Sequence, residues 1–348
     1  MWGMARKKEG ARRPRTGEAR LAAYLEATAA VLGHASRAAA ARAYCTGPLP
    51  PGERKSIEPM AARIEPGRAQ AKHQSMHHVV AKAGWDDAAL LRAVREQALP
   101  AIGRHGPVRH WMVDDTSFPK RGEHSVGAAR QYCGQLGKQE NCQVAVSLSV
   151  ANDRASLPVA WRLYLPETWA EDPARRAKPG VPEEVAFETK TAIALAQLRR
   201  AREEGVPVGI VLSDAAYGDE SDFRVGVAAL DLRHVLGIRG ATTVWPPSQA
   251  PLPPAPWSGR GRPPARLRRS PEHQPLAVKD LAMGLPARAR RTVTRREGSG
   301  AAPTSRFAAL RVRPAHRDTQ RSEPWPEEWL LVEWPEGDRK STRLNSSH

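Results

Sequence analysis

The sequence predicts an α/β fold that joins an N-terminal helical domain, a mixed sheet with helices, and a proline- and arginine-rich insertion that contains strands. Three observations predict it. Apolar residues recur at three- and four-residue steps up to about Ala101, and short apolar runs then alternate with helical patterns up to about Gly240. From Trp245 onward, prolines and arginines dominate. The 348 residues suffice for one large domain with an insertion or for two or three small domains.

The first two segments differ in periodicity. Residues 1–20 are charged and contain Gly and Arg, so we expect a disordered basic tail. Residues 21–105 follow a helical pattern, interrupted by prolines at 48–51, and we expect a small helical domain that binds DNA. His77 and His78 lie in this pattern without a ligand partner at metal spacing, so we expect them on a helix surface or in the core.

Residues 106–244 are expected to form the first part of an α/β core. The expected strands lie at 111–115, 142–150, 157–165, 208–214 and 235–238, and the expected helices lie at 183–204 and 220–230. The resulting order, β-β-β-α-β-α-β, is that of the ribonuclease H-like fold. In that fold the first and fourth strands lie side by side.

The first and fourth of these apolar runs each end in a carboxylate, at Asp115 and Asp214. A buried strand that stops at an acidic residue directs it out of the sheet edge, and two such strands side by side suit hard divalent cations. Asp114 precedes Asp115, and because successive side chains of a strand point to opposite faces, only one of the two enters such a site. The alternative for either strand end is an Asp that caps a turn or a helix.

Paired carboxylates at adjacent strand ends hold Mg²⁺ or Mn²⁺ and leave coordination positions open for substrate phosphate. Two such ions about 4 Å apart activate the attacking oxygen and stabilise the leaving oxygen of a phosphodiester. We expect Asp115 to bridge both ions and Asp214 to hold one. Glu333 also follows an apolar run, but its run is strand-like, so we interpret Glu333 as a structural acid.

The charge balance favours a polyanionic partner, and DNA is the first candidate. Lys and Arg number 54 against 37 Asp and Glu, which gives a net charge of +17 and a pI of about 10.5. A GC-rich genome explains the abundance of Arg and Ala, but it does not explain the excess of base over acid. The insertion, 245–338, concentrates this excess, because residues 258–321 hold 16 Lys and Arg against 4 Asp and Glu.

Eight basic residues are candidates for phosphate contact, because clustered cations gain from counterion release. They are Lys120, Arg121, Lys138, Arg260, Arg262, Arg266, Arg268 and Arg269. For the first three, a merely solvated hairpin surface is an equal alternative. Trp245 and Trp257 either stack on an unpaired base or anchor the core or a loop.

The remaining composition excludes several protein classes. The cysteines, Cys45, Cys133 and Cys142, lack the two-residue spacing of a zinc knuckle and do not suggest a disulfide framework. Cys133 has no His and Asp arrangement beside it, so we expect a packed thiol. No apolar stretch approaches the roughly 20 residues of a membrane span, and no secretory signal is present. We expect a cytoplasmic bacterial protein associated with the nucleoid.

Four sequence runs resemble bacterial insertion-sequence transposases of the DDE superfamily, in the group typified by insertion sequence seven-hundred-one. They are VDDTSFPKRG at 113–122, ARQYCGQLGK at 129–138, NCQVAVSLSV at 141–150 and VLSDAAYG at 211–218. The similarity extends from about Glu53 to Asp338. It implies Mg²⁺-dependent cleavage and joining of DNA at terminal inverted repeats and target DNA, by a homodimer. It also implies Asp115, which Thr116 follows, and Asp214 as the first two catalytic acids.

The chain departs from this group at its C-terminal end. The helix that carries the group's catalytic Glu is expected after 334–337 and is absent, and residues 339–348 resemble a non-native tail. We therefore expect a C-terminally truncated transposase without its third acid, inactive as it stands. Two alternatives remain, a DNA-binding regulator without catalysis and a generic ribonuclease H-like nuclease.

Overall fold

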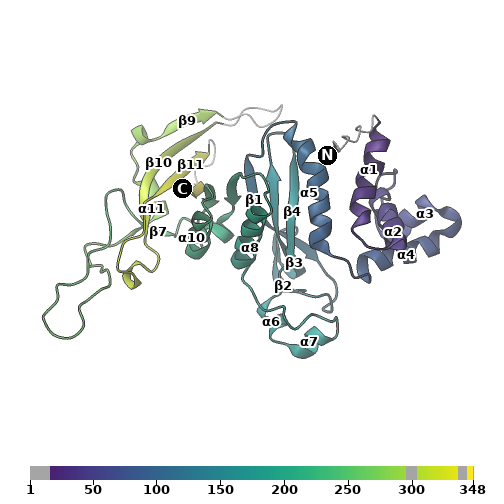
Figure 1. Cartoon of the computed structure of the whole chain (residues 1–348). Coiled ribbons are helices and arrows are strands. Elements are labelled where there is room, and N and C mark those ends of the chain that lie inside the picture. Colours follow the sequence, from purple (N-terminus) through teal and green to yellow (C-terminus); the bar gives the residue numbers. More distant parts are fainter. Residues whose placement is uncertain (1–15, 295–303, 336–342, 348) are drawn as a thin grey trace, which may run out of the picture. The chain divides into compact units, whose positions relative to one another are not determined.

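A computed structural model describes residues 16–294, 304–335 and 343–347 (Figure 1). The chain divides into two compact units, residues 1–104 and 105–348, and each is described by itself. Among the described residues, no helix combines the length and the apolar character that crossing a membrane requires.

The first unit is helical. Its helices are α1 (Gly17–Ala30), α2 (Ala35–Thr46), α3 (Ile57–Ile64), α4 (Ala69–Ala81) and α5 (Asp87–Gly103). Helix α1 begins earlier than expected, because the Thr16 hydroxyl accepts a 3.1 Å hydrogen bond from the Ala19 N–H and caps it. Residues 17–20 are therefore helical, and the rest of the expected tail, 1–15, lies outside the described residues. His77 and His78 are exposed on α4.

The second unit contains the sheet that carries the acidic strand ends. Its first strands are β1 (His110–Pro119), β2 (Ala129–Cys133), β3 (Lys138–Ala151), β4 (Ser156–Leu163), β5 (Ile210–Ser213) and β6 (His234–Gly237). One edge of β3 pairs with β1, and β2 and β4 also pair with β3, all antiparallel. The chain then crosses over to β5, which lies between β1 and β6 and is parallel to both.

The parallel pairing of β1 and β5 determines where the acids lie. Its register runs from His110 opposite Ile210 to Met112 opposite Leu212. Asp214 therefore follows the carboxyl end of β5 beside the middle of β1, where Asp114 and Asp115 lie. The expected end of the first strand at Asp115 was wrong, because β1 stays paired with β3 as far as Pro119 opposite Cys142. The mixed α/β architecture agrees with the sequence-based expectation.

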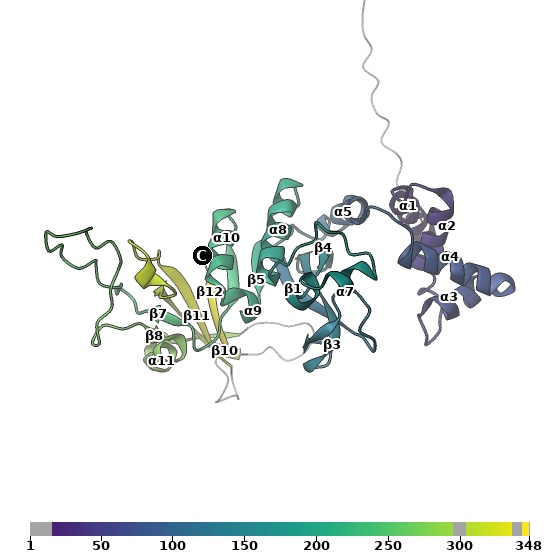
Figure 2. The same ribbon diagram turned by 90° about the horizontal axis from the view of Figure 1, so that it is seen from below.

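Helices α8 (Lys190–Glu203) and α10 (Ser221–Ala229) follow strands of this sheet, with the one-turn α9 (Ala215–Gly218) directly after β5 (Figure 2). Helix α8 packs on β3 and β4 and also contacts α10. It begins seven residues later than expected, because Thr189 caps it by accepting a 3.1 Å hydrogen bond from Ala192 N–H. The short helices α6 (Glu167–Ala170) and α7 (Pro173–Ala177) lie in the connection between β4 and α8.

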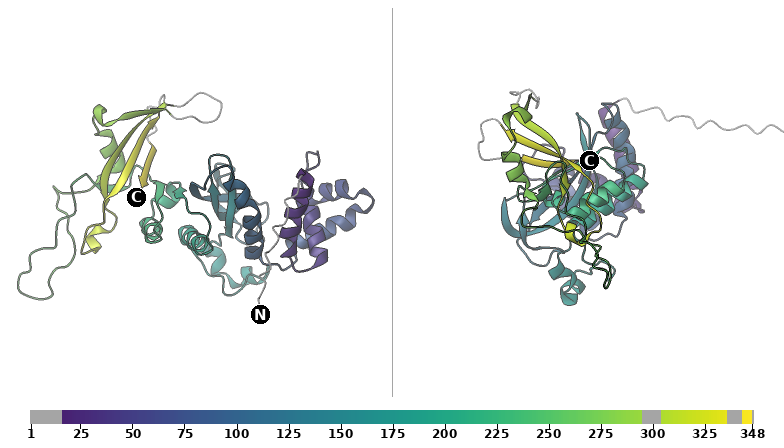
Figure 3. Two further views of the ribbon diagram at one scale, coloured as in Figure 1. Left: turned by 45° about the horizontal axis from the view of Figure 1, so that its top comes forward. Right: turned by 90° about the vertical axis from the view of Figure 1, so that its left-hand side faces the viewer.

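The C-terminal part of the second unit contains several strands, a long loop and one short helix (Figure 3). Its elements are β7 (Thr243–Trp245), β8 (Leu276–Ala277), α11 (Val278–Met283), β9 (Arg291–Thr294), β10 (Thr304–Pro314), β11 (Glu328–Pro335) and β12 (Arg343–Ser347). Strand β12, in the segment expected to be a non-native tail, pairs with β11 and with β6. Buried Val312, Leu330 and Val332 belong to the core of this region.

Close packing of two glycines holds α9 against β6. A Cβ atom at Gly218 would lie 1.9 Å from the Gly237 carbonyl oxygen and 2.9 Å from Leu236 Cβ. At Gly237, a Cβ atom would lie 2.9 Å from the Ala215 N atom. Neither contact allows a side chain, so the backbone of α9 lies directly on β6, beside the end of β5.

We expect Gly218→Ala to lower the free energy of unfolding by about 2 to 3 kcal/mol, because the added methyl group would push α9 away from β6. Urea denaturation measures this change. Gly122→Ala is the matched control, since a Cβ atom at Gly122 meets no atom within 4 Å. Equal effects of the two substitutions would contradict the packing argument.

Candidate active site

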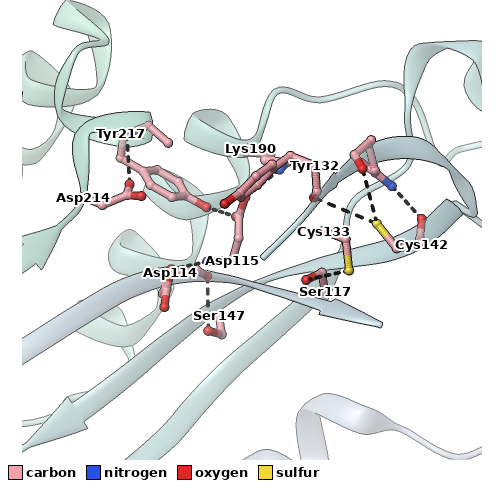
Figure 4. Close-up of polar contacts among 12 residues, drawn as sticks. Asp114, Asp115, Ser117, Tyr132, Cys133, Cys142, Ser147, Lys190, Asp214 and Tyr217 are labelled. Atoms are coloured by element: carbon pink, nitrogen blue, oxygen red, sulfur yellow. Dashed lines mark hydrogen bonds and ion pairs between the residues drawn. The ribbon is translucent and has the colours of Figure 1, made fainter. Parts of the chain in front are cut away.

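The Asp115 carboxylate binds two donors that come from different helices (Figure 4). Lys190 Nζ, at the start of α8, lies 2.5 Å from Asp115 Oδ2. The Tyr217 hydroxyl, on α9, donates to Asp115 Oδ1. Because the caps of α8 and α9 determine where these helices begin, the two donors approach Asp115 in the middle of β1 from fixed positions.

Asp214 is the N-cap residue of α9. Its Oδ1 atom accepts a 2.9 Å hydrogen bond from Ala216 N–H, so the helix-cap alternative is realised for one carboxylate oxygen. The residue is exposed, and Oδ2 has no hydrogen-bond partner among the described residues. Capping thus fixes the orientation of this carboxylate and leaves one oxygen for a ligand.

Asp114 lies on the opposite face of β1 from Asp115, as strand alternation requires. Two residues beyond the last paired positions, the β1–β5 register places Asp114 opposite Asp214. Burial, opposed in part by a 2.8 Å hydrogen bond from Asp115 N–H, raises the pKa of Asp114, and the charges of Asp214 and Asp115 add to the rise. The three carboxylates therefore interact electrostatically.

The Tyr217 hydroxyl interacts electrostatically with all three carboxylates. Burial contributes most to a strongly raised pKa of its hydroxyl, followed by the hydrogen bond to Asp115 and the charges of Asp115, Asp114 and Asp214. The phenol therefore stays protonated at neutral pH and serves as a hydrogen-bond donor. Its ring packs 5.5 Å from the Phe223 ring, which anchors it to α10.

The donor set at this edge consists of hard carboxylate oxygens, which suit Mg²⁺ or Mn²⁺. The pKa of Asp114 is raised first by burial and further by the charges of Asp214 and Asp115, and this repulsion also favours a cation there. Within the described part of the chain, however, no three His, Cys, Asp or Glu side chains are grouped so that they could hold a metal ion. Glu333 is buried in β11, opposite Phe307 of β10, consistent with its interpretation as a structural acid.

The sequence-based reasoning assigned no role to Lys190 or to Tyr217. The sequence contained a signal for Tyr217, because this residue follows Asp214 by three positions and therefore lies in the first turn of the helix that Asp214 caps. Lys190 had none, since 75 residues separate it from Asp115 and only the packing of α8 on the sheet brings them together.

The candidate phosphate contacts at the end of β1 and the start of β3 differ in their surroundings. Lys120 is half-buried and Arg121 is exposed after the end of β1, and neither side chain has a partner among the described residues. Lys138 is exposed and forms a 3.2 Å ion pair with Glu140. Lys120 and Arg121 are therefore cations without side-chain partners in the described chain, directly after the C-terminal end of β1.

The candidate contacts in the insertion divide in the same way. Arg260, Arg262 and Arg266 are exposed, without side-chain partners in the described chain. Arg268 is also exposed, and its Nε donates to the Pro253 carbonyl oxygen at 3.0 Å. Arg269 differs from these residues, because its side chain is bound by other groups of the protein and has a structural role.

Arg269 belongs to a buried polar cluster. It forms a 2.7 Å ion pair with Asp318, which is fully buried, and Trp245 Nε1 donates to the same carboxylate at 2.8 Å. Trp245 is fully buried and stacks on His273, so it is a core residue. Trp257 is 55% exposed.

The thiols of Cys133 and Cys142 are buried and pack with Val144. Burial, followed by the charge of Cys133, raises the pKa of Cys142 to about 11. Cys133 contacts the Ser117 hydroxyl at 3.5 Å. These surroundings agree with the expectation of a packed Cys133 thiol.

Comparison with known proteins gives two matches. Residues 28–302 match the family described as DDE superfamily endonuclease. The chain is also 26% identical over 167 residues to a probable transposase for insertion sequence element IS701 from Microchaete diplosiphon. That alignment covers 48% of this chain and 40% of the relative, so it spans less than half of either protein. Because the family match covers well over half of the chain, this protein belongs to the DDE superfamily endonuclease family.

Proposed function

We propose that this protein is a transposase-type nuclease that cleaves and joins phosphodiester bonds at the ends of an insertion element. The observation that carries this proposal is the parallel pairing of β1 and β5, which brings the β1 segment with Asp114 and Asp115 beside the chain at Asp214. In this proposal the fold is ribonuclease H-like. The order of β4, β3, β1, β5 and β6, with three antiparallel strands before two parallel ones, supports it.

Asp115 and Asp214 are the residues that would hold Mg²⁺ or Mn²⁺. When bound, such ions activate the attacking oxygen and stabilise the leaving oxygen of the phosphodiester. Lys190 and Tyr217 fix the orientation of the Asp115 carboxylate, and the backbone N–H of Ala216 fixes that of Asp214. Lys120 and Arg121, which follow the C-terminal end of β1, would attract the DNA backbone.

The partners in this proposal are the terminal inverted repeats and the target DNA. The N-terminal helical unit would bind the element ends, and two copies of the chain would act together on paired ends. The formal net charge of +17 supports a polyanionic partner. The IS701 relative, named as a probable transposase, supports the same activity.

A second candidate function is DNA binding without catalysis. In the described chain no third acidic ligand joins Asp115 and Asp214, and the Lys190 ammonium already neutralises Asp115. A protein with this arrangement would bind element ends and would regulate rather than catalyse transposition. Metal binding and DNA cleavage distinguish the two functions.

Metal binding is the first test. We expect Mg²⁺ or Mn²⁺ to raise the melting temperature of the protein, because the cation relieves repulsion among the carboxylates. Asp115→Asn and Asp214→Asn should each weaken metal binding at least about tenfold, as titration followed by thermal shift would show. The matched control is Asp153→Asn, since Asp153 is exposed and lies away from the acidic edge. Metal binding unchanged in both site variants would contradict the assignment.

Nicking of inverted-repeat DNA is the second test. If the protein is a nuclease, Asp115→Ala and Asp214→Ala should each reduce Mg²⁺-dependent nicking at least about 100-fold, because the metal ligands are lost. Asp153→Ala should retain the activity. Nicking that survives both site substitutions would exclude the mechanism, and metal-independent DNA binding without any nicking would select the second candidate.

The role of Arg269 gives a further prediction. Arg269→Ala should destabilise the protein by about 3 kcal/mol, because it leaves the buried Asp318 carboxylate without its ion pair. Urea denaturation measures the loss, and Arg266→Ala is the control from the same loop. At a temperature where both variants are folded, Arg266→Ala should weaken DNA binding more than Arg269→Ala does. The reverse order of DNA-binding losses would indicate that Arg269 contacts DNA.

A further inference from the structure

A long loop between β7 and β8 carries several unpartnered arginines of the insertion. Leu252 and Arg268 close its base by exchanging two backbone hydrogen bonds of 2.9 Å. The residues between them form no helix or strand, and the loop extends from the C-terminal sheet of its unit (Figures 1 and 3). Arg260 and Arg262 lie near its tip.

Three arginines elsewhere in the insertion are held by the protein itself. Their guanidinium groups lie over tryptophan rings, at 4.5 Å for Arg290 on Trp334, 5.1 Å for Arg311 on Trp329 and 3.6 Å for Arg321 on Trp325. By contrast, Arg260, Arg262 and Arg266 are exposed and make no side-chain contact within the described residues. The loop therefore presents cations that are free to meet an external anion.

Two glycines with positive φ angles shape the tip of the loop. Gly259 and Gly261 have φ angles of +81° and +72°, and a Cβ atom at either would meet no atom within 4 Å. Trp257 Nε1 donates to the Gly261 carbonyl oxygen at 3.2 Å and turns the chain. Pro263 and Pro264 follow, with fixed φ angles and no N–H donor, so they continue the tip without strand pairing.

We propose that this tip enters the minor groove of A·T-rich duplex DNA, with Gly261 facing the groove floor and Arg260 and Arg262 lying along it on either side. This inference rests on the proposed action on DNA. It adds a preferred base composition and a mode of contact.

Groove dimensions and electrostatics favour this mode. The minor groove is about 6 Å wide, and an α-helix or β-ribbon is accommodated in the major groove. A glycine between two arginines allows the backbone to approach the groove floor closely. A·T tracts narrow the groove and strengthen its negative potential, which attracts Arg, whereas guanine adds an amino group there. The guanidinium is also more weakly hydrated than the ammonium of Lys, so it enters a narrow groove more readily.

Fluorescence anisotropy with the full chain tests the proposal at one fixed ionic strength. The probes are three duplexes of equal length with A·T, G·C or inosine·cytosine tracts. An inosine·cytosine pair lacks the guanine amino group in the minor groove but keeps the major-groove pattern of G·C. We expect the A·T and inosine·cytosine duplexes to bind about tenfold more tightly than the G·C duplex.

Charge-preserving variants separate groove entry from phosphate attraction. The double variant Arg260→Lys with Arg262→Lys keeps the charge, so its salt dependence should be unchanged, but its preference should fall to within about twofold. The matched control is Arg288→Lys with Arg291→Lys, because both residues are exposed arginines of the same insertion without side-chain partners among the described residues. This control should retain the full preference.

Each remaining outcome has one meaning. Equal binding of the three duplexes by the unsubstituted chain would overturn the groove assignment and leave the proposed action on DNA intact. Inosine·cytosine binding as weak as G·C binding would also overturn it, since the preference would then come from the major groove. If the Arg260 and Arg262 variant kept the preference for A·T over G·C duplexes, these two residues would not be the ones that contact the minor groove. Failure to bind any duplex would overturn both proposals.

Discussion

The structure of the acidic edge depends on the parallel pairing of β1 with β5. A parallel pair needs a long crossover connection, and here that connection includes β3, β4 and α8. Close backbone contacts hold β5 at both ends. A Cβ atom at Gly209 would lie 2.8 Å from the His110 N atom, and one at Gly218 would overlap the Gly237 carbonyl oxygen. The β1 segment with Asp114 and Asp115 therefore lies beside Asp214 because glycines let β5 and α9 approach their neighbours.

Concentrating three carboxylates at one edge costs stability, and the surrounding groups offset part of that cost. Lys190 supplies a positive charge 2.5 Å from Asp115, and the same ammonium lies 5.4 Å from the centre of the Tyr164 ring. Tyr217 donates to the other oxygen of Asp115. A divalent cation that binds Asp115 Oδ2 would have to displace Lys190 or share the oxygen with it. Lys190 and a metal ion would thus stabilise the same carboxylate in alternative states of the site.

The sequence was sufficient to predict the elements that depend on local pattern. Alternation and apolar runs located the strand that carries Asp115 and the strand that Asp214 follows, although β1 continues to Pro119 instead of ending at Asp115. Proline density located the loop that follows Trp245. Contacts between distant segments were not predictable in this way. The structural role of Arg269 depends on Asp318, which lies 49 residues further along the chain, and Arg269 resembles its neighbours in sequence. The predicted start of α8 was also wrong by seven residues. The helical pattern begins earlier in the sequence, but Thr189 caps the helix and α8 begins at Lys190.

Net charge alone overestimates how many cations of the insertion can meet DNA. The arginines that lie on tryptophan rings or pair with buried acids gain interactions inside the protein and would lose them by turning outward. Counterion release rewards only the phosphates that a protein actually neutralises. The salt dependence of DNA binding by this region should therefore follow the exposed, unpartnered arginines rather than its total charge. The same division separates residues that build the insertion from residues available for recognition, although both contribute equally to the composition.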